Sequence, residues 1–322
     1  MKRRDLLKLA AATAVPLIGR QSQAQATPLR IITGFPAGGG LDLCARLVGE
    51  QMSTTLARPV LVEPKPGAAG RIAVQYVKAA PPDGHTLLLT PASMMVIYPW
   101  TFKAPGYDPV ADFVPVAGAV VVQFGLAVRE GIPVSNIKDY VSWVKADSKR
   151  ALYGTPAAGS TPSFLGGLFS AAAGLDLKPV DYKGNAPLIN DLIGGHIDAG
   201  FATVGDMVEY HRNRKLQVLA VAGPERSPAL PDVPTFRELG YTAVDGEEWY
   251  GFFLPRGASP SVAETYAKAV NAAVLQPKLV ERWRALGWRP IELGPSALEQ
   301  TLKSDMARWR EIVGKSGYVP QD

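Results

Sequence analysis

The sequence predicts an α/β protein of two lobes, each a mainly parallel sheet flanked by helices, with a ligand cleft between the lobes. Three observations lead to this fold class. The 322 residues exceed what one hydrophobic core usually organises. Short β-prone runs alternate with amphipathic helices, an order typical of parallel sheets covered on both faces. Two β-prone segments, 114–128 and 248–254, lie where the chain can cross between lobes.

The first 26 residues have the layout of an export signal. A basic start at residues 2–4 precedes an apolar stretch at 6–18, and an A-x-A cleavage site ends at Ala26. The adjacent Arg3 and Arg4, followed by Asp-Leu-Leu-Lys, resemble the twin-arginine signal, with a general secretory leader as the alternative. We therefore expect residues 1–26 to be removed near Ala26, which leaves a soluble exported protein.

The excess of positive charge belongs mostly to this leader. The chain has 34 Lys and Arg against 29 Asp and Glu, a net charge of +5. Five of these basic residues and one of the acids precede residue 27, so the remainder carries a net charge of +1. A nearly neutral chain gives no reason to expect nucleic acid as a partner. The single cysteine, Cys44, excludes an internal disulfide.

The chain after the leader begins with strand–helix units. Apolar residues recur at helical spacing from Leu43 to Leu56, which predicts a helix. Runs of β-prone residues bounded by glycine and proline predict strands on either side of it. The predicted strands are 29–33, 60–63 and 86–90, and the predicted helices are 41–57 and 71–79.

A second series of units follows the segment 114–128, which is longer than a typical strand. Its predicted helices are 135–146, 163–173, 186–194 and 206–213, and its predicted strands are 152–154, 179–182, 197–201 and 217–222. A proline-rich segment at 224–234 then leads to the strand 248–254. The last predicted helices are 261–275, 278–286 and 296–314.

The two crossing segments determine the expected domain organisation. Because the chain crosses twice, residues 27–125 and 249–322 form a discontinuous lobe 1, and residues 126–248 form lobe 2. Two strands that join two lobes make a hinge, and the ligand of such a protein lies between the lobes.

Catalysis and metal binding have little support in the residues. The three histidines and one cysteine do not occur in H-E-x-x-H or C-x-x-C spacing. A G-x-S-x-G nucleophile elbow does not occur in the sequence either. We therefore expect no enzyme activity, no catalytic residue, no metal site and no cofactor.

Two glycine-containing loops are the main candidates for a binding site. Residues 34–40 and 154–161 each join a predicted strand to a predicted helix, and the first loop has neither dinucleotide nor P-loop spacing. Free N–H groups at a helix N-terminus attract an anion such as a carboxylate, and glycine lets a ligand approach the backbone closely. Loops of this kind on facing lobes can hold one anion from both sides. The alternative is that each loop is a tight turn that binds nothing.

Five sequence motifs follow one another along the chain after the leader. They are ITGFPAGGG at 32–40, APPDGHTLL at 80–88, YDP at 107–109 with DFVPV at 112–116, YKG at 182–184 with DLIGG at 191–195, and RSPALPDVPT at 226–235. In this order they resemble the Bug/TctC substrate-binding proteins of tripartite tricarboxylate transporters. The resemblance implies a two-lobed periplasmic binding protein-like fold that closes on a small carboxylate or related ligand.

The resemblance also implies which residues hold the ligand. In this family the two glycine-containing loops bind a carboxylate largely through backbone amides and ordered water. The implied positions are Phe35, Ala37, Gly38, Gly39 and Asp42 in lobe 1, Ala158, Gly159, Ser160 and Thr161 in lobe 2, and Ser93 and Thr203 as further residues of the cleft. Asp42 also has a simpler role, because an acid in the first helical turn complements the helix dipole.

Glu247 and Glu248 depart from the family pattern, in which small hydroxyl residues often precede the aromatic pair at 249–250. One hypothesis is that Glu247 or Glu248 receives a cationic or hydroxylated group, so that the ligand is not a plain di- or tricarboxylate. We therefore include Glu248 among the candidate ligand-binding residues. The alternative is that both glutamates face solvent at the start of a strand.

Capture of a solute in the periplasm is the function that the resemblance implies. We expect a monomer that delivers its ligand to the membrane permease subunits of a tripartite tricarboxylate transporter. The alternative within the same fold is a ligand-sensing periplasmic subunit of a signalling system.

Overall fold

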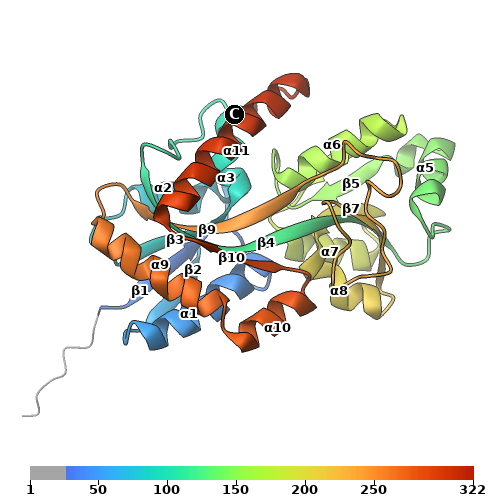
Figure 1. Ribbon diagram of the computed structural model, residues 1–322. Helices are drawn as coiled ribbons and strands as arrows, with labels where there is room; N and C mark the ends of the chain where they lie inside the picture. The colour runs from blue at the N-terminus through green and yellow to red at the C-terminus, as the bar shows by residue number, and fades with distance from the viewer. Residues whose placement is uncertain (1–26) are drawn as a thin grey trace, which may run out of the picture.

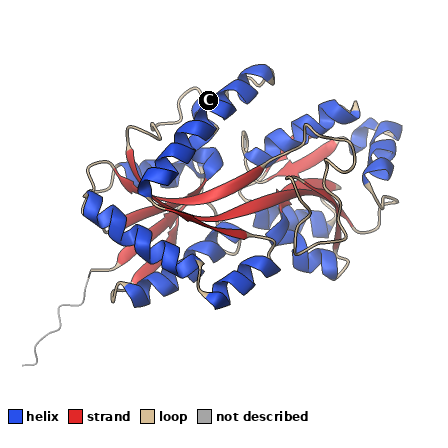
Figure 2. Ribbon diagram, viewed as in Figure 1, coloured by secondary structure: helices blue, strands red, loops and turns tan. Residues whose placement is uncertain are grey.

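A ten-stranded sheet runs through the protein from one lobe to the other (Figures 1 and 2). The computed structural model describes residues 27–322, so the expected signal peptide at 1–26 lies outside the described residues. The strands are β1 (Leu29–Thr33), β2 (Val60–Pro64), β3 (Thr86–Pro91), β4 (Phe113–Arg129), β5 (Leu152–Thr155), β6 (Lys178–Asp181), β7 (Ala199–Thr203), β8 (Leu216–Val221), β9 (Glu247–Pro255) and β10 (Arg289–Leu293). Their order is β2-β1-β3-β9-β4-β7-β5-β6, and β8 and β10 also pair with β4.

Helices cover both faces of the sheet in each lobe (Figure 2). The helices are α1 (Gly40–Thr55), α2 (Arg71–Lys78), α3 (Ala92–Val96), α4 (Tyr98–Thr101), α5 (Ile137–Ala146), α6 (Thr161–Ala173), α7 (Asn185–Gly194), α8 (Val204–Arg212), α9 (Pro260–Val274), α10 (Pro277–Ala285) and α11 (Pro295–Lys315), with short 3₁₀ turns at Ala68–Gly70 and Ser148–Arg150. Several helices begin directly after a strand, so their N-termini lie at the carboxyl ends of the strands. This is the edge at which open α/β sheets bind ligands.

The long strand β4 belongs to both lobes, and β9 runs beside it. Residues 113–123 of β4 pair antiparallel with β9, from Phe113 opposite Pro255 to Gln123 opposite Glu247. The remainder of β4 pairs with β7 and β8 of lobe 2. The expected crossings at 114–128 and 248–254 therefore correspond to β4 and β9. The lobe boundaries at 125/126 and 248/249 fall within or near these strands and stay a prediction.

Parallel pairing is confined to the outer strands of each lobe. The parallel pairs are β1 with β2, β1 with β3, β5 with β6, and β5 with β7. The strands β4, β8, β9 and β10 pair antiparallel in the middle of the sheet. A chain that crosses between lobes and returns must place its crossing strands in opposite directions, which explains this pattern.

Every helix and strand predicted from the sequence is present, with ends within a few residues of those expected. Three short elements were not predicted, namely α3, α4 and β10. Helices of four or five residues show too little of the 3.6-residue period to be recognised. β10 contains Pro290 and lies at the sheet edge against β4, where a proline is tolerated.

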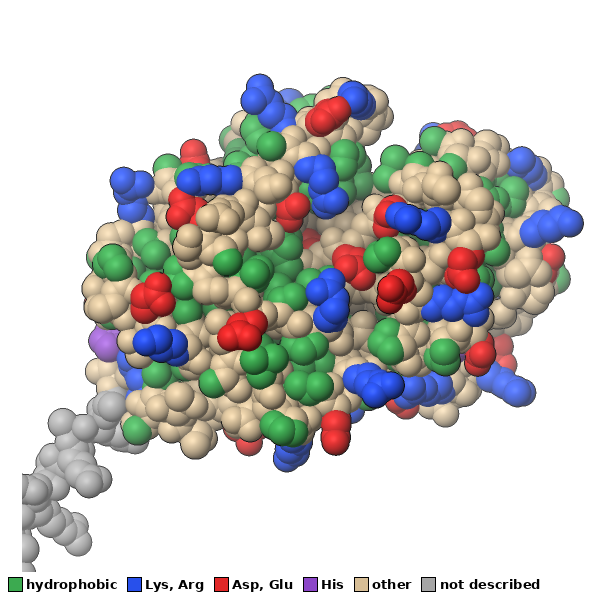
Figure 3. Space-filling view, in the orientation of Figure 1, with side chains coloured by type: hydrophobic (Ala, Val, Ile, Leu, Met, Phe, Trp, Pro, Cys, Tyr) green, Lys and Arg blue, Asp and Glu red, His purple; other side chains and the backbone are tan. Residues whose placement is uncertain are grey.

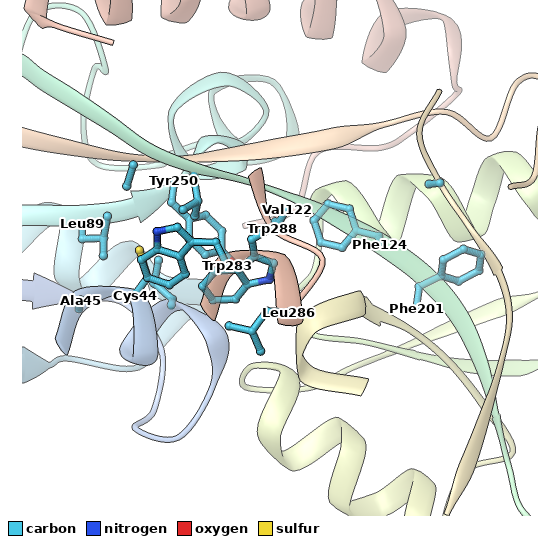
Figure 4. Packing of buried hydrophobic residues seen from close by; sticks show 14 of the residues in the cluster. Cys44, Ala45, Leu89, Val122, Phe124, Phe201, Tyr250, Trp283, Leu286 and Trp288 are labelled. Carbon is cyan, nitrogen blue, oxygen red and sulfur yellow. The ribbon is translucent and has the colours of Figure 1, made fainter. Parts of the chain in front are cut away.

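An aromatic cluster packs beneath β4 and β9 at the junction of the lobes (Figure 4). Trp283 and Trp288 are buried and stack with ring centroids 5.5 Å apart, and Tyr250 meets Trp288 edge-on at 6.0 Å. Trp288 also reaches the first turns of α1 and α8: a Cβ added at Gly40 or Gly205 would lie 2.8 Å or 2.3 Å from the indole. Glycine at these two positions therefore lets both helices approach the same tryptophan.

The surface and the helices give two further findings. On the face shown in Figure 3, basic and acidic side chains are interspersed. Within residues 27–322, no helix combines the length and the apolar character needed to cross a membrane.

Candidate functional site

A narrow cavity of about 50 Å³ lies between the two lobes. In Figure 3 the surface is hollowed between α11 and lobe 2. Lobe 1 lines the cavity with the loop before α1, the junction of β3 and α3, and the crossing strands. Lobe 2 lines it with the loops that follow β5, β6 and β7. The lining residues are Phe35, Pro36, Gly39, Gly40, Leu41, Asp42, Pro91, Ser93, Phe124, Pro156, Ala157, Ser160, Pro162, Gly184, Asn185, Ala186, Pro187, Thr203, Glu248 and Tyr250.

In lobe 1, the N-terminus of α1 points at the cavity without a side-chain cap. Gly39 is the N-cap residue, with an extended backbone and no side chain to accept a bond from the first turn. A Cβ added at Gly39 would meet no atom within 4 Å, so the space beside it is open. The Gly40 N–H of this turn is donated to Asp206 of lobe 2, so the N–H groups of Leu41 and Asp42 are the ones available to a ligand anion.

Asp42 lies in the first turn of α1 and is tied to its own lobe. Its carboxylate accepts two hydrogen bonds from Arg46, at 2.9 and 3.0 Å, and one from the Gly38 N–H at 3.1 Å. Asp42 is buried, whereas the Arg46 side chain is half exposed outside the cavity. The negative charge of Asp42 is thus balanced by a cation that does not itself line the cavity.

Glu248, on β9, is buried and lies against α3. Its carboxylate accepts a hydrogen bond from the Ser93 N–H, and only 5% of the residue is exposed. Burial raises the pKa of Glu248 to about 7, although the hydroxyl groups of Ser93 and Thr161 and the Ser93 N–H act in the opposite direction. The alternative that both glutamates face solvent is therefore wrong for Glu248.

Glu247 points away from Glu248, as neighbouring residues of a strand do. It is partly exposed and forms a salt bridge with Arg289 of β10, at 3.1 Å. Glu247 does not line the cavity. Of the two glutamates that the sequence left open, the structure places Glu248 in the cleft.

In lobe 2, the loop between β5 and α6 supplies the facing wall. Ser160 is the N-cap residue of α6, and its hydroxyl donates to the Ala157 carbonyl oxygen at 2.6 Å rather than capping the helix. Pro162 has no N–H group, so the first turn of α6 offers the backbone N–H groups of Thr161 and Ser163. This wall therefore presents amides and hydroxyls without charge.

Three polar side chains of lobe 2 form a hydrogen-bonded network next to this wall. Asn185 Nδ2 donates to Thr203 Oγ1 at 3.0 Å and to Asp206 Oδ2 at 2.7 Å, and Thr203 also donates to Asp206. Burial raises the pKa of Asp206, and a hydrogen bond from the Gly40 N–H opposes this effect. Since Gly40 begins α1, Asp206 links the first turn of lobe 1 to lobe 2.

No lysine, arginine or histidine belongs to the set of described residues that line the cavity. The positive potential comes instead from the N-termini of α1, α6, α7 and α8, which meet there. No group of three or more side chains within residues 27–322 has the arrangement of a metal site. The arrangement is suited to holding a small polar ligand without covalent chemistry.

Seven of the twelve predicted site residues line the cavity: Phe35, Gly39, Asp42, Ser93, Ser160, Thr203 and Glu248. Ala37 and Gly38 are exposed at the rim, and Ala158 lines a neighbouring hollow. Gly159 packs against Thr101 and Tyr318. Thr161 is buried beside Glu248.

The sequence analysis missed the loop after β6, which brings Asn185 to the cavity, and the aromatic residues Phe124 and Tyr250. The strand–glycine–helix order at 182–186 was the available signal for Asn185, because it matches the two loops that were recognised. Phe124 and Tyr250 lie on the crossing strands, and their direction depends on how those strands pair.

The two lobes touch outside the cavity as well. Phe164 of α6 packs against Trp309 of α11 and against Tyr318, with ring centroids 5.6 Å and 5.3 Å apart. Gly184 of lobe 2 lies against Phe35 and Pro36. These contacts cross the cleft, as expected when the lobes are drawn together.

Comparisons with known proteins give the same architecture. A family model described as "Tripartite tricarboxylate transporter family receptor" matches residues 44–318. The structure of the periplasmic binding protein BugD is 32% identical, with a TM-score of 0.87, and covers 91% of this chain and 99% of its own. MatC from Rhodopseudomonas palustris with bound malate is 29% identical, with a TM-score of 0.84, and covers 89% of this chain and 98% of its own. A further R. palustris protein with adipate is 26% identical, with a TM-score of 0.86, and covers 92% of this chain and 99% of its own.

Proposed function

Because the chain belongs to the tripartite tricarboxylate transporter receptor family, whose members are substrate-binding proteins, we propose that it captures a small carboxylate-bearing ligand in its interlobe cleft. It then delivers this ligand to the membrane permease of a tripartite tricarboxylate transporter. Export to the periplasm on a twin-arginine signal, with cleavage near Ala26, is part of this proposal.

The observation that carries the proposal is the meeting of helix N-termini at one cavity between the lobes. The first turns of α1 and α6 face it from opposite lobes, and neither N-cap residue, Gly39 or Ser160, caps its helix with its own side chain. Backbone N–H groups at such ends bind carboxylates without a basic side chain. The malate and adipate in the two R. palustris structures are carboxylates, which supports this ligand class.

Each wall has an assigned part in holding the ligand. We assign the carboxylate of the ligand to the amides around Gly39 and to those that follow Ser160. Phe35 supplies apolar contact, and Ser93 and Thr203 supply polar groups at the sides. The remaining candidates, Ala37, Gly38, Ala158 and Gly159, act through the shape of the two loops or through ordered water, while Thr161 contributes its N–H to the second group of amides.

Ligand binding favours the closed arrangement only through its greater affinity for that state. The contacts between Phe164 and α11 form part of the closed arrangement. A protein that closes in this way presents a different surface to the permease when it holds ligand. This difference allows the permease to select the loaded form.

Native mass spectrometry of freshly purified protein, followed by release of the bound molecule, tests the proposal. We expect one small carboxylate per chain, released intact. Turnover of the released compound, or failure of every carboxylate in a thermal-shift panel to raise the melting temperature, would contradict solute capture. A pull-down from membranes with and without ligand tests delivery, because permease subunits should be recovered with the loaded protein. Recovery of a histidine kinase in their place would favour sensing.

A further inference from the structure

Among the residues that the structure describes, Glu248 is a buried acid without a cation to balance it. The residue is 5% exposed, lies at the cavity and receives the Ser93 N–H. An ionised carboxylate taken out of water is costly unless a positive charge compensates it. Within residues 27–322, no lysine or arginine forms a salt bridge with Glu248.

The other acids near the cavity differ from Glu248 in their partners. Asp42 is balanced by Arg46, and Glu247 is balanced by Arg289. Asp206 has no cation in its network either, but it receives donors from Asn185, Thr203 and Gly40. The cleft therefore contains two carboxylates that no described cation balances, and one of them, Glu248, lines the cavity.

Aromatic rings complete this side of the cavity. Tyr250 follows Glu248 by two residues on the same face of β9, and Phe35 and Phe124 also line the space. The faces of aromatic rings carry negative potential and attract cations. A carboxylate beside aromatic rings, in a space lined by no basic residue, is a suitable environment for an organic ammonium group.

We propose that the ligand is a zwitterion, and that Glu248 receives its ammonium group while the amides at the N-termini of α1 and α6 receive its carboxylate. This inference rests on the proposed function, and it narrows the ligand class from carboxylates in general to amino acids and related amino carboxylates. A ligand of this kind spans the cleft, because its anionic end needs both lobes and its cationic end needs the crossing strand β9.

A plain dicarboxylate offers a different partner for Glu248. In that case a protonated Glu248 would donate a hydrogen bond to the second carboxylate of the ligand. Glutamine can also donate this hydrogen bond, so Glu248→Gln would preserve binding of a dicarboxylate. It would remove the charge that an ammonium group needs, and the substitution therefore separates the two cases.

Isothermal titration calorimetry with matched probes tests the inference. The pairs are aspartate and succinate, glutamate and glutarate, leucine and 4-methylpentanoate, and phenylalanine and 3-phenylpropanoate; each pair differs by one ammonium group. In at least one pair, the amino member should bind the wild-type protein about tenfold or more tightly than its partner. Glu248→Gln should remove this preference, while Glu247→Gln, whose side chain faces Arg289, should keep it.

The outcomes separate this inference from the function on which it depends. Binding of plain carboxylates with no gain from the ammonium group, or an unchanged preference in a Glu248→Gln variant that still unfolds cooperatively, would overturn the inference and leave solute capture intact. Failure of all eight probes to bind would overturn both.

Discussion

The two walls of the cleft use different chemistry although both are built from a strand, a glycine-containing loop and a helix. The backbone of lobe 1 holds two carboxylates, that of Asp42 and that of Glu248, which lies on the crossing strand β9 at the predicted lobe boundary. The loop of lobe 2 presents Ser160 and uncharged amides. The same local fold therefore supplies an anion-binding end in each lobe, and the acids that line the cavity, Asp42 and Glu248, both lie on the side held by the lobe 1 backbone. The asymmetry gives the cleft a direction along which a ligand with two unlike ends can be oriented.

The largest loss of ligand affinity should come from filling the open space beside the N-terminus of α1 with a side chain. Gly39→Val places a branched side chain in the cavity at a position whose φ of −88° and ψ of 171° any residue can adopt. Ligand affinity should fall more than a hundredfold, about 3 kcal/mol, while the fold persists. Calorimetric titration and a thermal melt check the two expectations.

Gly294→Val is the matched control. Gly294 is also an N-cap glycine, with φ of −81° and ψ of −178°, and a Cβ there meets no atom within 4 Å. It does not line the cavity, so this variant should bind like the wild type. Equal losses in both variants would show that the effect comes from the helix cap and not from the cleft.

The buried acid Glu248 should make the free energy of unfolding depend on pH. Glu248 has a pKa of about 7 when folded and about 4.5 in its ordinary state, so the folded protein holds more protons between these values. Stability therefore falls as pH rises through this window, by up to about 3 kcal/mol. Tyr98 and Tyr250 are coupled to Glu248, but they stay protonated there because burial raises their pKa values far above this range.

Urea unfolding of the ligand-free protein at pH 4.5 to 8 measures this dependence. Glu248→Gln should reduce its slope and should be the more stable protein at pH 8, while Asp206, whose pKa is also raised by burial, leaves a residual dependence of the same sign. Glu247→Gln keeps the buried acid and should reproduce the wild-type slope. A slope that persists unchanged in Glu248→Gln would assign the pH dependence to another group.

Ligand affinity also depends on how closely the two walls meet. Gly205→Ala adds a Cβ 2.3 Å from Trp288 Nε1 and 3.0 Å from the Leu286 carbonyl oxygen, so lobe 2 must move away from lobe 1. Affinity should fall about tenfold, because closure no longer brings both walls to the ligand. Small-angle X-ray scattering should show a larger radius of gyration in the presence of ligand. Gly167→Ala, on α6 with open space around it, should change neither quantity.

The smallest effect should follow from removing the ion pair between Arg46 and Asp42, behind the lobe 1 wall. Arg46→Gln removes the cation that balances Asp42, but the Arg46 side chain is 53% exposed and solvent screens the pair. We expect a loss of stability of about 0.5 kcal/mol and a lower affinity for anionic probes. A gain in anion affinity would contradict the balancing role of Arg46.

The fold could be predicted because its periodic segments are long enough to show their period. β1 has the bounds expected from the sequence, and the apolar run around β4 identified the crossing between lobes. The choice between Glu247 and Glu248 could not be made in this way. Adjacent strand residues face opposite sides, and only the pairing of β9 with β4 decides which side is the cleft.

Contacts between distant segments could not be predicted from the sequence for the same reason. Asn185 begins α7 and Asp206 lies in the first turn of α8, and their hydrogen bond forms only when β6 and β7 place those helices side by side. The glycine-containing loops at 34–40 and 154–161 could be recognised as candidates because strand, glycine and helix follow one another directly in the chain. The local part of the site was therefore predictable, and the part assembled by the sheet was not.

Trp288 packs between α1 and α8, so its fluorescence can report the movement of the two lobes. Its indole Nε1 is buried without a hydrogen-bond partner among the described residues, in contact with both lobes. Separation of the lobes would admit water to this ring and shift its fluorescence to longer wavelength, whereas closure would shift it back. A Trp288-only protein, with the other five tryptophans replaced by phenylalanine, would then report each capture and release without an added label.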